Sequence, residues 1–481
     1  MPVDGGSMIM NAGAVSGRSE AKGRQRSLTA ILVGGGIWAL GGKCIGAALG
    51  LGITAMLARL MPPAELGIYL LAFSIVAAAA TVARLGLEQV GLRLVAEHLG
   101  CDDVVAAAAV AWRALAAVAL AGLVIGAGGG VLLGPWLGYR VFGSAALAEA
   151  MPAAAAWLAC FAVQLTLAEL FRGCRDIRLA SLFGGTAFGG VLSTGLLAAT
   201  VGGAWALGMS LDARRALLIS AAATAMATML GAALLARRLP PSWKPAPRGP
   251  GWWPLVRLGL PLLVSQLGML IVLQADIWIL GMFRSESEVA LYGAASRVVR
   301  LLALLTVVND VTAPEIARLN VRRQHERLQT LLQMTATVAA LPCLVALVVL
   351  AVAPGELLTL LFGPFYRDGA PILLVLALGT AFVAFVGSAP YVLMMTGHGA
   401  VRMAVALGGT AAMLAGGLAL TPAFGAIGLA AAVAGALAAQ QIAAWLCVRR
   451  CCGIWTHADP VKAAGLLWRF LTARTNSSHA A

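Results

Sequence analysis

Long apolar segments, separated by short charged or Pro- and Gly-rich breaks, run from about residue 31 to residue 448. Many exceed 18 residues, and about 20 apolar residues suffice for a helix to cross roughly 30 Å of hydrocarbon. The segments do not alternate apolar and polar residues as the strands of a membrane β-barrel do. They fall at 31–57, 66–91, 106–133, 151–171, 179–203, 215–236, 257–282, 288–314, 329–352, 369–395, 401–420 and 424–448. The pattern predicts an all-α integral membrane protein with about twelve transmembrane helices.

Composition supports this class. The chain has 481 residues, of which 60% are hydrophobic and 11% are charged, with a mean hydropathy of +0.90. A soluble domain carries about 25% charged residues because water must solvate its surface. A surface this poor in charge is suited to lipid.

The net charge of +14 would suggest a nucleic-acid partner in a soluble protein. Here the 34 Lys and Arg residues concentrate in alternate loops, as expected for loops on the cytoplasmic side of a membrane. Loops on the opposite side hold only Arg59, Arg140, Arg214, Arg215, Arg284 and Arg367. We therefore expect both termini in the cytoplasm, no cleavable signal peptide and no nucleic-acid partner.

The longest connection, 237–256, is rich in proline and basic residues, and it divides the chain into six helices and six helices. The predicted organisation is a basic tail (1–30), a first lobe (31–236), this linker, a second lobe (257–448) and a C-terminal tail (449–481). Glu65 and Tyr69 recur 223 residues later as Glu288 and Tyr292, although the chain has only five tyrosines. Because six helices precede the second copy, the pattern indicates two parallel-related lobes with a cavity between them.

Charged side chains within the predicted spans are candidate functional residues, because a charge at mid-bilayer costs about 2.5–3.5 kcal/mol on insertion scales. The chain has nine: Lys43, Arg84, Glu88, Arg113, Glu169, Asp276, Arg297, Arg300 and Asp310. Four lie within about two turns of a cytoplasmic end, where pairing or contact with water is inexpensive: Arg84, Glu88, Glu169 and Asp310. Since Arg84 and Glu88 stand at i and i+4, a structural ion pair is the simplest interpretation.

The deeper cations predict an aqueous cavity that attracts a negative group such as a diphosphate. Lys43, Arg297 and Arg300 are the deepest, and Arg113 is intermediate, so these four are candidate substrate-binding residues. Asp276 lies at a depth similar to that of Arg297 and is a candidate partner for it. The alternative is that the cations cap backbone carbonyls or reach water independently.

Catalytic and metal-binding motifs are missing from the sequence. It has no phosphate loop, HExxH motif, nucleophile elbow or carboxylate pair, so we expect neither an enzyme nor a bound cofactor. Cys447, Cys451, Cys452 and His457 cluster near the end, but their spacing fits no common zinc pattern, and we expect no metal.

Three segments resemble bacterial polysaccharide flippases of the multidrug/oligosaccharidyl-lipid/polysaccharide (MOP) superfamily. KCIGAALGLGITAMLARLMPPAELGIYLLAFSIV (43–76) is similar to the Lys-bearing first helix, the turn and the second helix of that family. RLGLPLLVSQLGMLIVLQADIWILGMFRSESEVALYGAASRVV (257–299) resembles its seventh and eighth helices, and FGPFYRDGAPILLVLAL (362–378) its helix 9–10 region. By this resemblance Lys43, Asp276 and Arg297 match positions in the family pattern. Arg84 departs from it, since an Asp is common there.

The resemblance implies two six-helix lobes around a cationic cavity that move undecaprenyl-pyrophosphate-linked oligosaccharide across the bacterial inner membrane. The expected partners are that lipid-linked sugar, membrane lipids, and the polymerase and glycosyltransferases of the same polysaccharide. A proton or sodium gradient is expected to drive turnover, with Asp276 as the ion-sensitive group. The alternatives are an ion-coupled drug or cation antiporter of the same fold, a lipid II flippase, a membrane-embedded polymerase or ligase, and a structural membrane protein.

Overall fold

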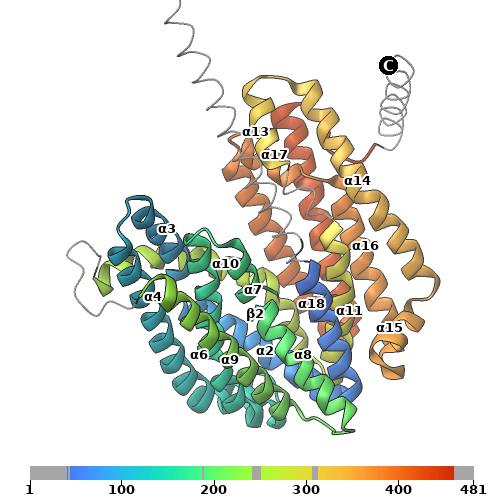
Figure 1. Ribbon diagram of the computed structural model, residues 1–481. Helices are drawn as coiled ribbons and strands as arrows, with labels where there is room; N and C mark the ends of the chain where they lie inside the picture. Colours follow the sequence, from blue (N-terminus) through green and yellow to red (C-terminus); the bar gives the residue numbers. More distant parts are fainter. Residues whose placement is uncertain (1–40, 42–43, 187–188, 241–250, 306–311, 460–481) are drawn as a thin grey trace, which may run out of the picture.

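The computed structural model describes residues 41, 44–186, 189–240, 251–305 and 312–459 (Figure 1). Nearly all of these residues are helical. The first half of the chain contains the helix Cys44–Leu60, α2 (Pro63–Ala83), α3 (Leu87–Gly100), α4 (Val104–Ile125), η1 (Gly126–Leu133), α5 (Gly134–Trp136), η2 (Leu137–Val141), α6 (Ala145–Gly173), α7 (Ile177–Phe183), β1 (Gly185–Thr186), β2 (Gly189–Gly190), α8 (Val191–Ala206) and α9 (Ala213–Arg238). The second half contains α10 (Trp252–Phe283), α11 (Glu286–Leu304), α13 (Ala313–Val321), α14 (His325–Val352), α15 (Pro354–Phe362), η4 (Pro364–Gly369), α16 (Ala370–Val386), α17 (Ala389–Met395) and α18 (Gly399–Cys452).

Each predicted span contains at least part of a described helix, although 31–57 and 288–314 lie only partly within the described residues. Eight of the described helices are long and apolar enough to cross a membrane, and the helices Cys44–Leu60 and Val191–Ala206 are shorter apolar ones. α11 adds a further segment of 19 residues that carries several charges. α18 contains two predicted spans, because Gly425, with φ 62 and ψ −145, breaks it at the predicted boundary. The chain is therefore a multi-pass α-helical membrane protein.

Three predicted spans are interrupted where glycine permits a backbone that other residues avoid. Within 66–91, Gly86 has φ +72 and separates α2 from α3. Within 179–203, the antiparallel pair β1–β2 separates α7 from α8, and Gly189 has φ +118. Within 369–395, Gly387 has φ +76 and ends α16, and a Cβ there would lie 2.7 Å from Cβ of Ala336. A hydropathy pattern does not detect such breaks, because glycine does not interrupt an apolar run.

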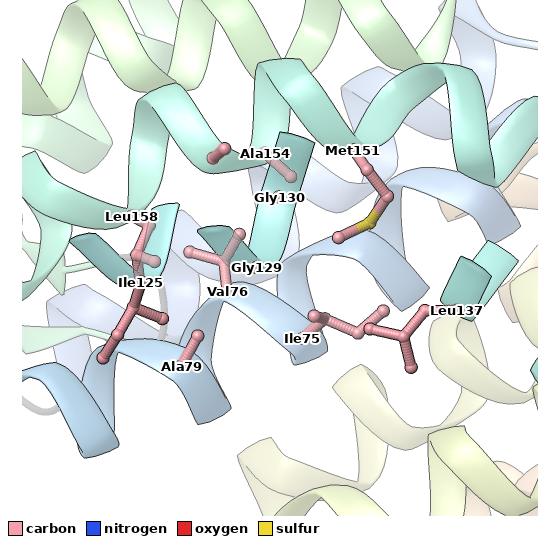
Figure 2. A pocket seen from close by; sticks show the side chains of 11 residues that line it. Ile75, Val76, Ala79, Ile125, Gly129, Gly130, Leu137, Met151, Ala154 and Leu158 are labelled. Carbon is pink, nitrogen blue, oxygen red and sulfur yellow. The ribbon is translucent and has the colours of Figure 1, made fainter. Parts of the chain in front are cut away.

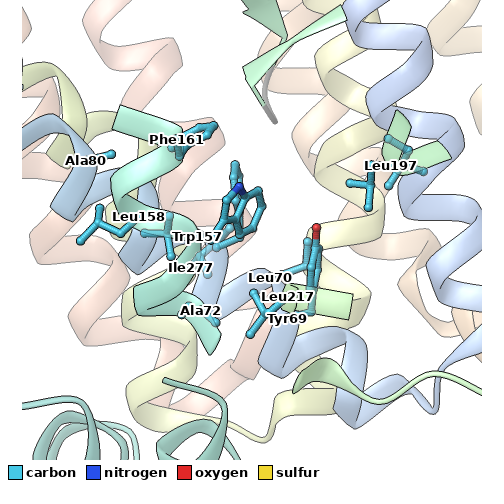
Figure 3. Close-up of a cluster of buried hydrophobic side chains, with 14 of the residues drawn as sticks. Tyr69, Leu70, Ala72, Ala80, Trp157, Leu158, Phe161, Leu197, Leu217 and Ile277 are labelled. Atoms are coloured by element: carbon cyan, nitrogen blue, oxygen red, sulfur yellow. The ribbon is translucent and has the colours of Figure 1, made fainter. Parts of the chain in front are cut away.

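An aromatic cluster joins α2 and α6 in the core of the first half (Figure 3). The ring of Trp157 lies 5.3 Å from that of Phe73 and 5.7 Å from that of Phe161. Its indole N–H donates to Thr224 Oγ1 on α9 at 2.8 Å, so the buried polar atom of the tryptophan is satisfied. The cluster fixes α2, one face of which meets the second half of the chain.

The predicted repeat has a physical counterpart in the two glutamates. Glu65, in the first turn of α2, accepts a hydrogen bond from the backbone N–H of Ala213, the first residue of α9, at 2.7 Å. Glu288, in the first turn of α11, accepts one from the N–H of Ala426, directly after the break in α18, at 3.2 Å. Each carboxylate thus caps the start of the last helix of its own half, where free N–H groups and the helix dipole favour a negative charge.

The segment after α18 folds back over the break between α16 and α17. Thr456 Oγ1 donates to the carbonyl of Val386 at 3.0 Å, and the N–H of Ala458 donates to that of Phe385 at 2.8 Å. These bonds satisfy carbonyl groups that the end of α16 leaves without a helical partner. Residues 453–459 are therefore part of the folded second half.

We predict that Glu65→Ala and Glu288→Ala each destabilise the protein by about 1 kcal/mol, the usual cost of losing a helix cap. Thermal unfolding of the purified protein in detergent would measure the effect. Glu149→Ala, which removes an exposed carboxylate from α6, is the control and should leave the midpoint unchanged. Equal midpoints for all three variants and the wild type would contradict a capping role.

Candidate functional site

Three of the predicted deep charges gather on the hairpin formed by α10 and α11. Asp276 lies near the end of α10, and Arg297 and Arg300 lie one turn apart on α11. Arg297 interacts electrostatically with both Arg300 and Asp276, and Asp276 also interacts with Arg300. We call these three residues, together with Tyr292, the α10–α11 cluster.

The carboxylate of Asp276 is held by two hydrogen bonds. Tyr292 Oη donates to Oδ2 at 2.9 Å, and the backbone N–H of Ile277 donates to Oδ1 at 2.8 Å. Tyr292 is 1% exposed, so this bond lies inside the protein. These two bonds fix the orientation of the carboxylate.

Arg297 is buried at the contact between α11 and α2. Its side chain is 8% exposed and interacts electrostatically with Tyr69 of α2, whose hydroxyl forms a hydrogen bond of 3.0 Å with Ser220 Oγ. A Cβ at Gly293, one turn before Arg297, would lie 2.4 Å from Leu70 Cδ1, so glycine lets the two helices approach closely. Arg300 is exposed. The cluster therefore combines a fixed guanidinium with an accessible one.

The α10–α11 cluster has an excess of positive charge. Two arginines and one aspartate leave a formal charge of +1 within the membrane-spanning part of the chain. A cavity of about 60 Å³ borders Asp276, between α10 and the two arms of α18, and Thr410 and Gln440 also line it. The cluster thus offers a guanidinium to an anion and an accessible carboxylate to a small cation.

The other two predicted substrate-binding residues are Lys43 and Arg113. Lys43 falls outside the described residues. Arg113 is partly buried on α4, among the helices of the first half, and its neighbour Trp112 donates its indole N–H to the carbonyl of Leu239 at 2.8 Å. The structure therefore brings Asp276, Arg297 and Arg300 together but does not add Arg113 to them. The roles of all these residues remain predictions.

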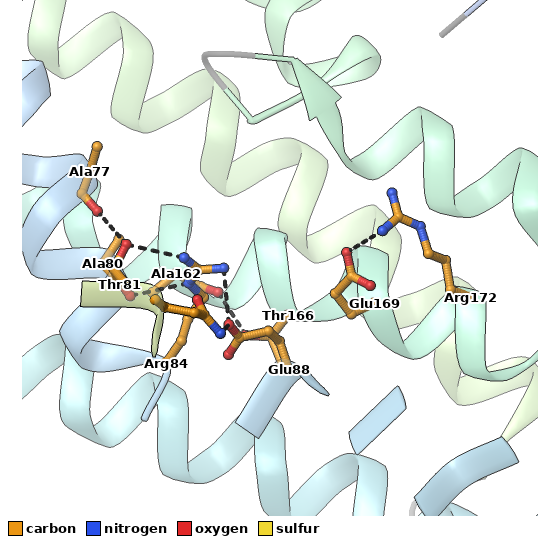
Figure 4. Close-up of polar contacts among 10 residues, drawn as sticks. Ala77, Ala80, Thr81, Arg84, Glu88, Ala162, Thr166, Glu169 and Arg172 are labelled. Atoms are coloured by element: carbon orange, nitrogen blue, oxygen red, sulfur yellow. Dashed lines mark hydrogen bonds and ion pairs between the residues drawn. The ribbon is translucent and has the colours of Figure 1, made fainter. Parts of the chain in front are cut away.

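The predicted ion pair of Arg84 and Glu88 is confirmed, with 3.3 Å between Arg84 Nη1 and Glu88 Oε1 (Figure 4). Glu169, another charge near a helix end, pairs with Arg172 at 2.6 Å. Asp310 lies outside the described residues. Charges near the helix ends are thus compensated locally, as their depth indicates.

A second cavity, of about 110 Å³, lies between α2, η1 and α6 (Figure 2). Its wall is formed by Ile75, Met151 and other apolar side chains, and Gly129 and Gly130 of the π-helical segment η1 leave it open. It contains no charged residue and is suited only to an apolar group. In the described part of the chain all eight cysteines are free, and no three His, Cys, Asp or Glu side chains are grouped to hold a metal ion.

Two tyrosines of the cluster region were not among the residues predicted for the site. Tyr69 and Tyr292 were noticed only as members of the repeat, yet one contacts Arg297 electrostatically and the other binds Asp276. Their scarcity in an apolar chain is the signal that could have identified them, since a buried tyrosine hydroxyl needs a partner.

We predict that Tyr292→Phe lowers the stability of the protein by about 1–2 kcal/mol, because a partly buried carboxylate loses a donor. The midpoint of thermal unfolding would show it. Tyr139→Phe, at an exposed tyrosine, is the matched control. A Tyr292→Phe midpoint equal to that of Tyr139→Phe would mean that the hydroxyl does not stabilise Asp276.

Solved structures share this fold over most of the chain. The lipid II flippase MurJ in its inward closed conformation matches with a TM-score of 0.65 at 13% identity, over 84% of this chain and 86% of that one. An inward-facing multidrug resistance MATE family transporter of the MOP superfamily matches with a TM-score of 0.58 at 18% identity, over 86% and 94%. A MOP superfamily transporter from Pyrococcus furiosus, whose title reports a binding pocket of reverse polarity, matches with a TM-score of 0.53 at 17% identity, over 86% and 94%.

Sequence comparison adds the family. None of the curated proteins compared matches the chain. The family profile described as Polysaccharide biosynthesis protein matches residues 32–320, which is more than half of the 481 residues. With the fold of the MOP superfamily, the chain belongs to the polysaccharide biosynthesis protein family.

Proposed function

We propose that the protein is a flippase that moves undecaprenyl-pyrophosphate-linked oligosaccharide from the inner to the outer leaflet of the bacterial inner membrane. The observation that carries the proposal is the α10–α11 cluster, which places Arg297 and Arg300 on one face of a membrane-spanning helix. A diphosphate is the negative group of such a substrate, and a guanidinium binds phosphate oxygens through two parallel hydrogen bonds. The family supports polysaccharide biosynthesis as the setting.

Transport would proceed by alternating access of the two six-helix halves. α2 forms a large part of the contact between the halves: Ser74 Oγ of α2 accepts from the indole N–H of Trp278 on α10 at 3.0 Å, and Gly67 of α2 lies against the backbone of Glu286. Rocking the halves about this contact would expose the cluster to one side of the membrane at a time. In the proposed orientation both termini and the basic loops are cytoplasmic.

Asp276 is the proposed ion-sensitive group. Its carboxylate borders a cavity and lies beside the two arginines, so binding of a proton or a sodium ion there would change the charge that the arginines experience. No other cofactor is proposed. The polymerase and glycosyltransferases of the same polysaccharide are the proposed protein partners.

A lipid II flippase is the second candidate, because MurJ shares the fold with a TM-score of 0.65. Its substrate also carries a diphosphate, so the α10–α11 cluster suits both. A drug or cation antiporter is less well supported, because a cationic substrate requires an excess of acidic groups, and the cluster has the opposite charge.

We predict that Arg297→Ala, Arg300→Ala and Lys43→Ala each abolish surface polysaccharide while leaving the protein in the membrane. Loss of a guanidinium or an ammonium removes a charge-assisted bond to the diphosphate. Staining of the surface polymer and immunoblotting of membranes would measure the two quantities. Arg93→Ala, at an exposed arginine of α3, is the control. Full polymer display in the three variants would remove these residues from the mechanism.

We predict that Asp276→Asn abolishes the dependence of flipping on a proton or sodium gradient. The amide keeps a hydrogen-bond acceptor for Tyr292 but loses the charge that an ion would neutralise. Vesicles reconstituted with the protein and a fluorescent lipid-linked oligosaccharide would report flipping with and without each gradient. Unchanged ion dependence would exclude Asp276 as the coupling group. Competition by lipid II in the same vesicles distinguishes the two candidate substrates.

A further inference from the structure

The first part of α10 touches the turn between α2 and α3 backbone to backbone. A Cβ at Gly86 would lie 2.2 Å from the carbonyl oxygen of Gly259, and a Cβ at Gly259 would lie 2.2 Å from that of Leu85. Only glycine allows this approach at either position. Leu85 and Gly86 have φ of 53 and 72, and a leucine adopts this left-handed conformation at a cost in free energy. The turn is thus shaped to receive α10.

A polar contact stands directly beside this backbone contact. Glu88, in the first turn of α3, accepts a hydrogen bond through Oε1 from the side-chain amide of Gln266 on α10, and the same oxygen lies 3.3 Å from Arg84 (Figure 4). Glu88 is 3% exposed. The carboxylate of Glu88 therefore takes part in the ion pair with Arg84 and also binds α10, the first helix of the second half.

The junction of Arg84, Glu88 and Gln266 is incompletely satisfied. Glu88 Oε2 is buried and has no hydrogen-bond partner among the residues that the structure describes. A buried polar network with an unused acceptor stabilises less than a complete one. Such a contact is suited to being broken and re-formed.

Much of the first part of α10 lies at the surface of the protein, and Val264 is 70% exposed. Over the most apolar stretch of α10 only 11% of the residues are buried, less than in any other of the eight long helices. Leu255 and Leu263 are buried and add apolar packing. The contact with the α2–α3 turn is therefore one of the few attachments of residues 252–266 to the first half.

We propose that Glu88 is a latch residue, which holds the first part of α10 against the α2–α3 turn through Gln266 and releases it when the two halves reorient. Glu88 is a positioning residue and contacts no substrate. The inference rests on the proposed function only in that alternating access supplies the reason to release α10. The contact itself is independent of what is transported.

Hydrogen–deuterium exchange of the full chain in lipid nanodiscs tests the latch. Glu88→Ala and Gln266→Leu each remove the bond, so amide exchange over residues 252–266 should accelerate about three- to tenfold, the effect of losing one hydrogen bond. Gln266→Leu keeps the size of a partly exposed side chain and retains the test if Glu88→Ala fails to fold. Glu97→Ala is the matched control, because it removes an exposed carboxylate, paired with Arg93 at 2.7 Å, from the same helix α3.

The proposal is overturned if exchange over residues 252–266 in the variants matches that of Glu97→Ala. It is also overturned if the acceleration spreads through α4 and α6, because a residue that merely stabilises the first half would loosen those helices too. The nanodiscs contain no lipid-linked sugar, so this outcome judges the latch alone. Failure of the proposed substrate would appear instead in the Arg297 and Arg300 variants.

Discussion

The structure depends on how each charged side chain inside a membrane-spanning helix finds a partner, because hydrocarbon offers none. Charges near helix ends are paired within one or two turns, as Arg84 is with Glu88 and Glu169 with Arg172. Arg297 is different, since it is buried between helices from the two halves, beside Tyr69 of α2. Because Arg297 carries a positive charge at this contact, a negative group that approached it would change the electrostatic energy of the interface between the halves.

The repeat shows how one sequence pattern can carry two kinds of role. Glu65 and Glu288 do the same work in both halves, each capping the last helix of its own half. Tyr69 and Tyr292, four residues later, have diverged: the first binds Ser220 in the core, and the second binds Asp276 in the α10–α11 cluster. The glutamates therefore preserve the architecture of each half, while the tyrosines distinguish the half that carries the accessible charges.

Hydropathy predicted the helical class and the regions in which the long apolar helices lie, because the length of an apolar run is set by the thickness of the bilayer. It did not predict the breaks at Gly387 and at β1–β2, since these depend on backbone angles and on close neighbours such as Ala336. Depth along the chain grouped Asp276 with Lys43, Arg297 and Arg300. The structure brings Asp276, Arg297 and Arg300 together, because α10 and α11 form a short hairpin, and Lys43 lies outside the described residues. Gln266 was not identified, because the importance of this amide depends on its contact with Glu88, which lies 178 positions earlier in the sequence.

α10 connects the contact with the α2–α3 turn to the α10–α11 cluster. Gln266, at the contact with the α2–α3 turn, and Asp276, in the α10–α11 cluster, are ten residues apart, which is about 15 Å of helix. Pro261 precedes both, so the helix between them is uninterrupted and transmits a displacement from one to the other. An ion or substrate that shifts Asp276 would therefore pull on the bond between Gln266 and Glu88. In the proposed transport cycle, that displacement would release the first part of α10 from the α2–α3 turn.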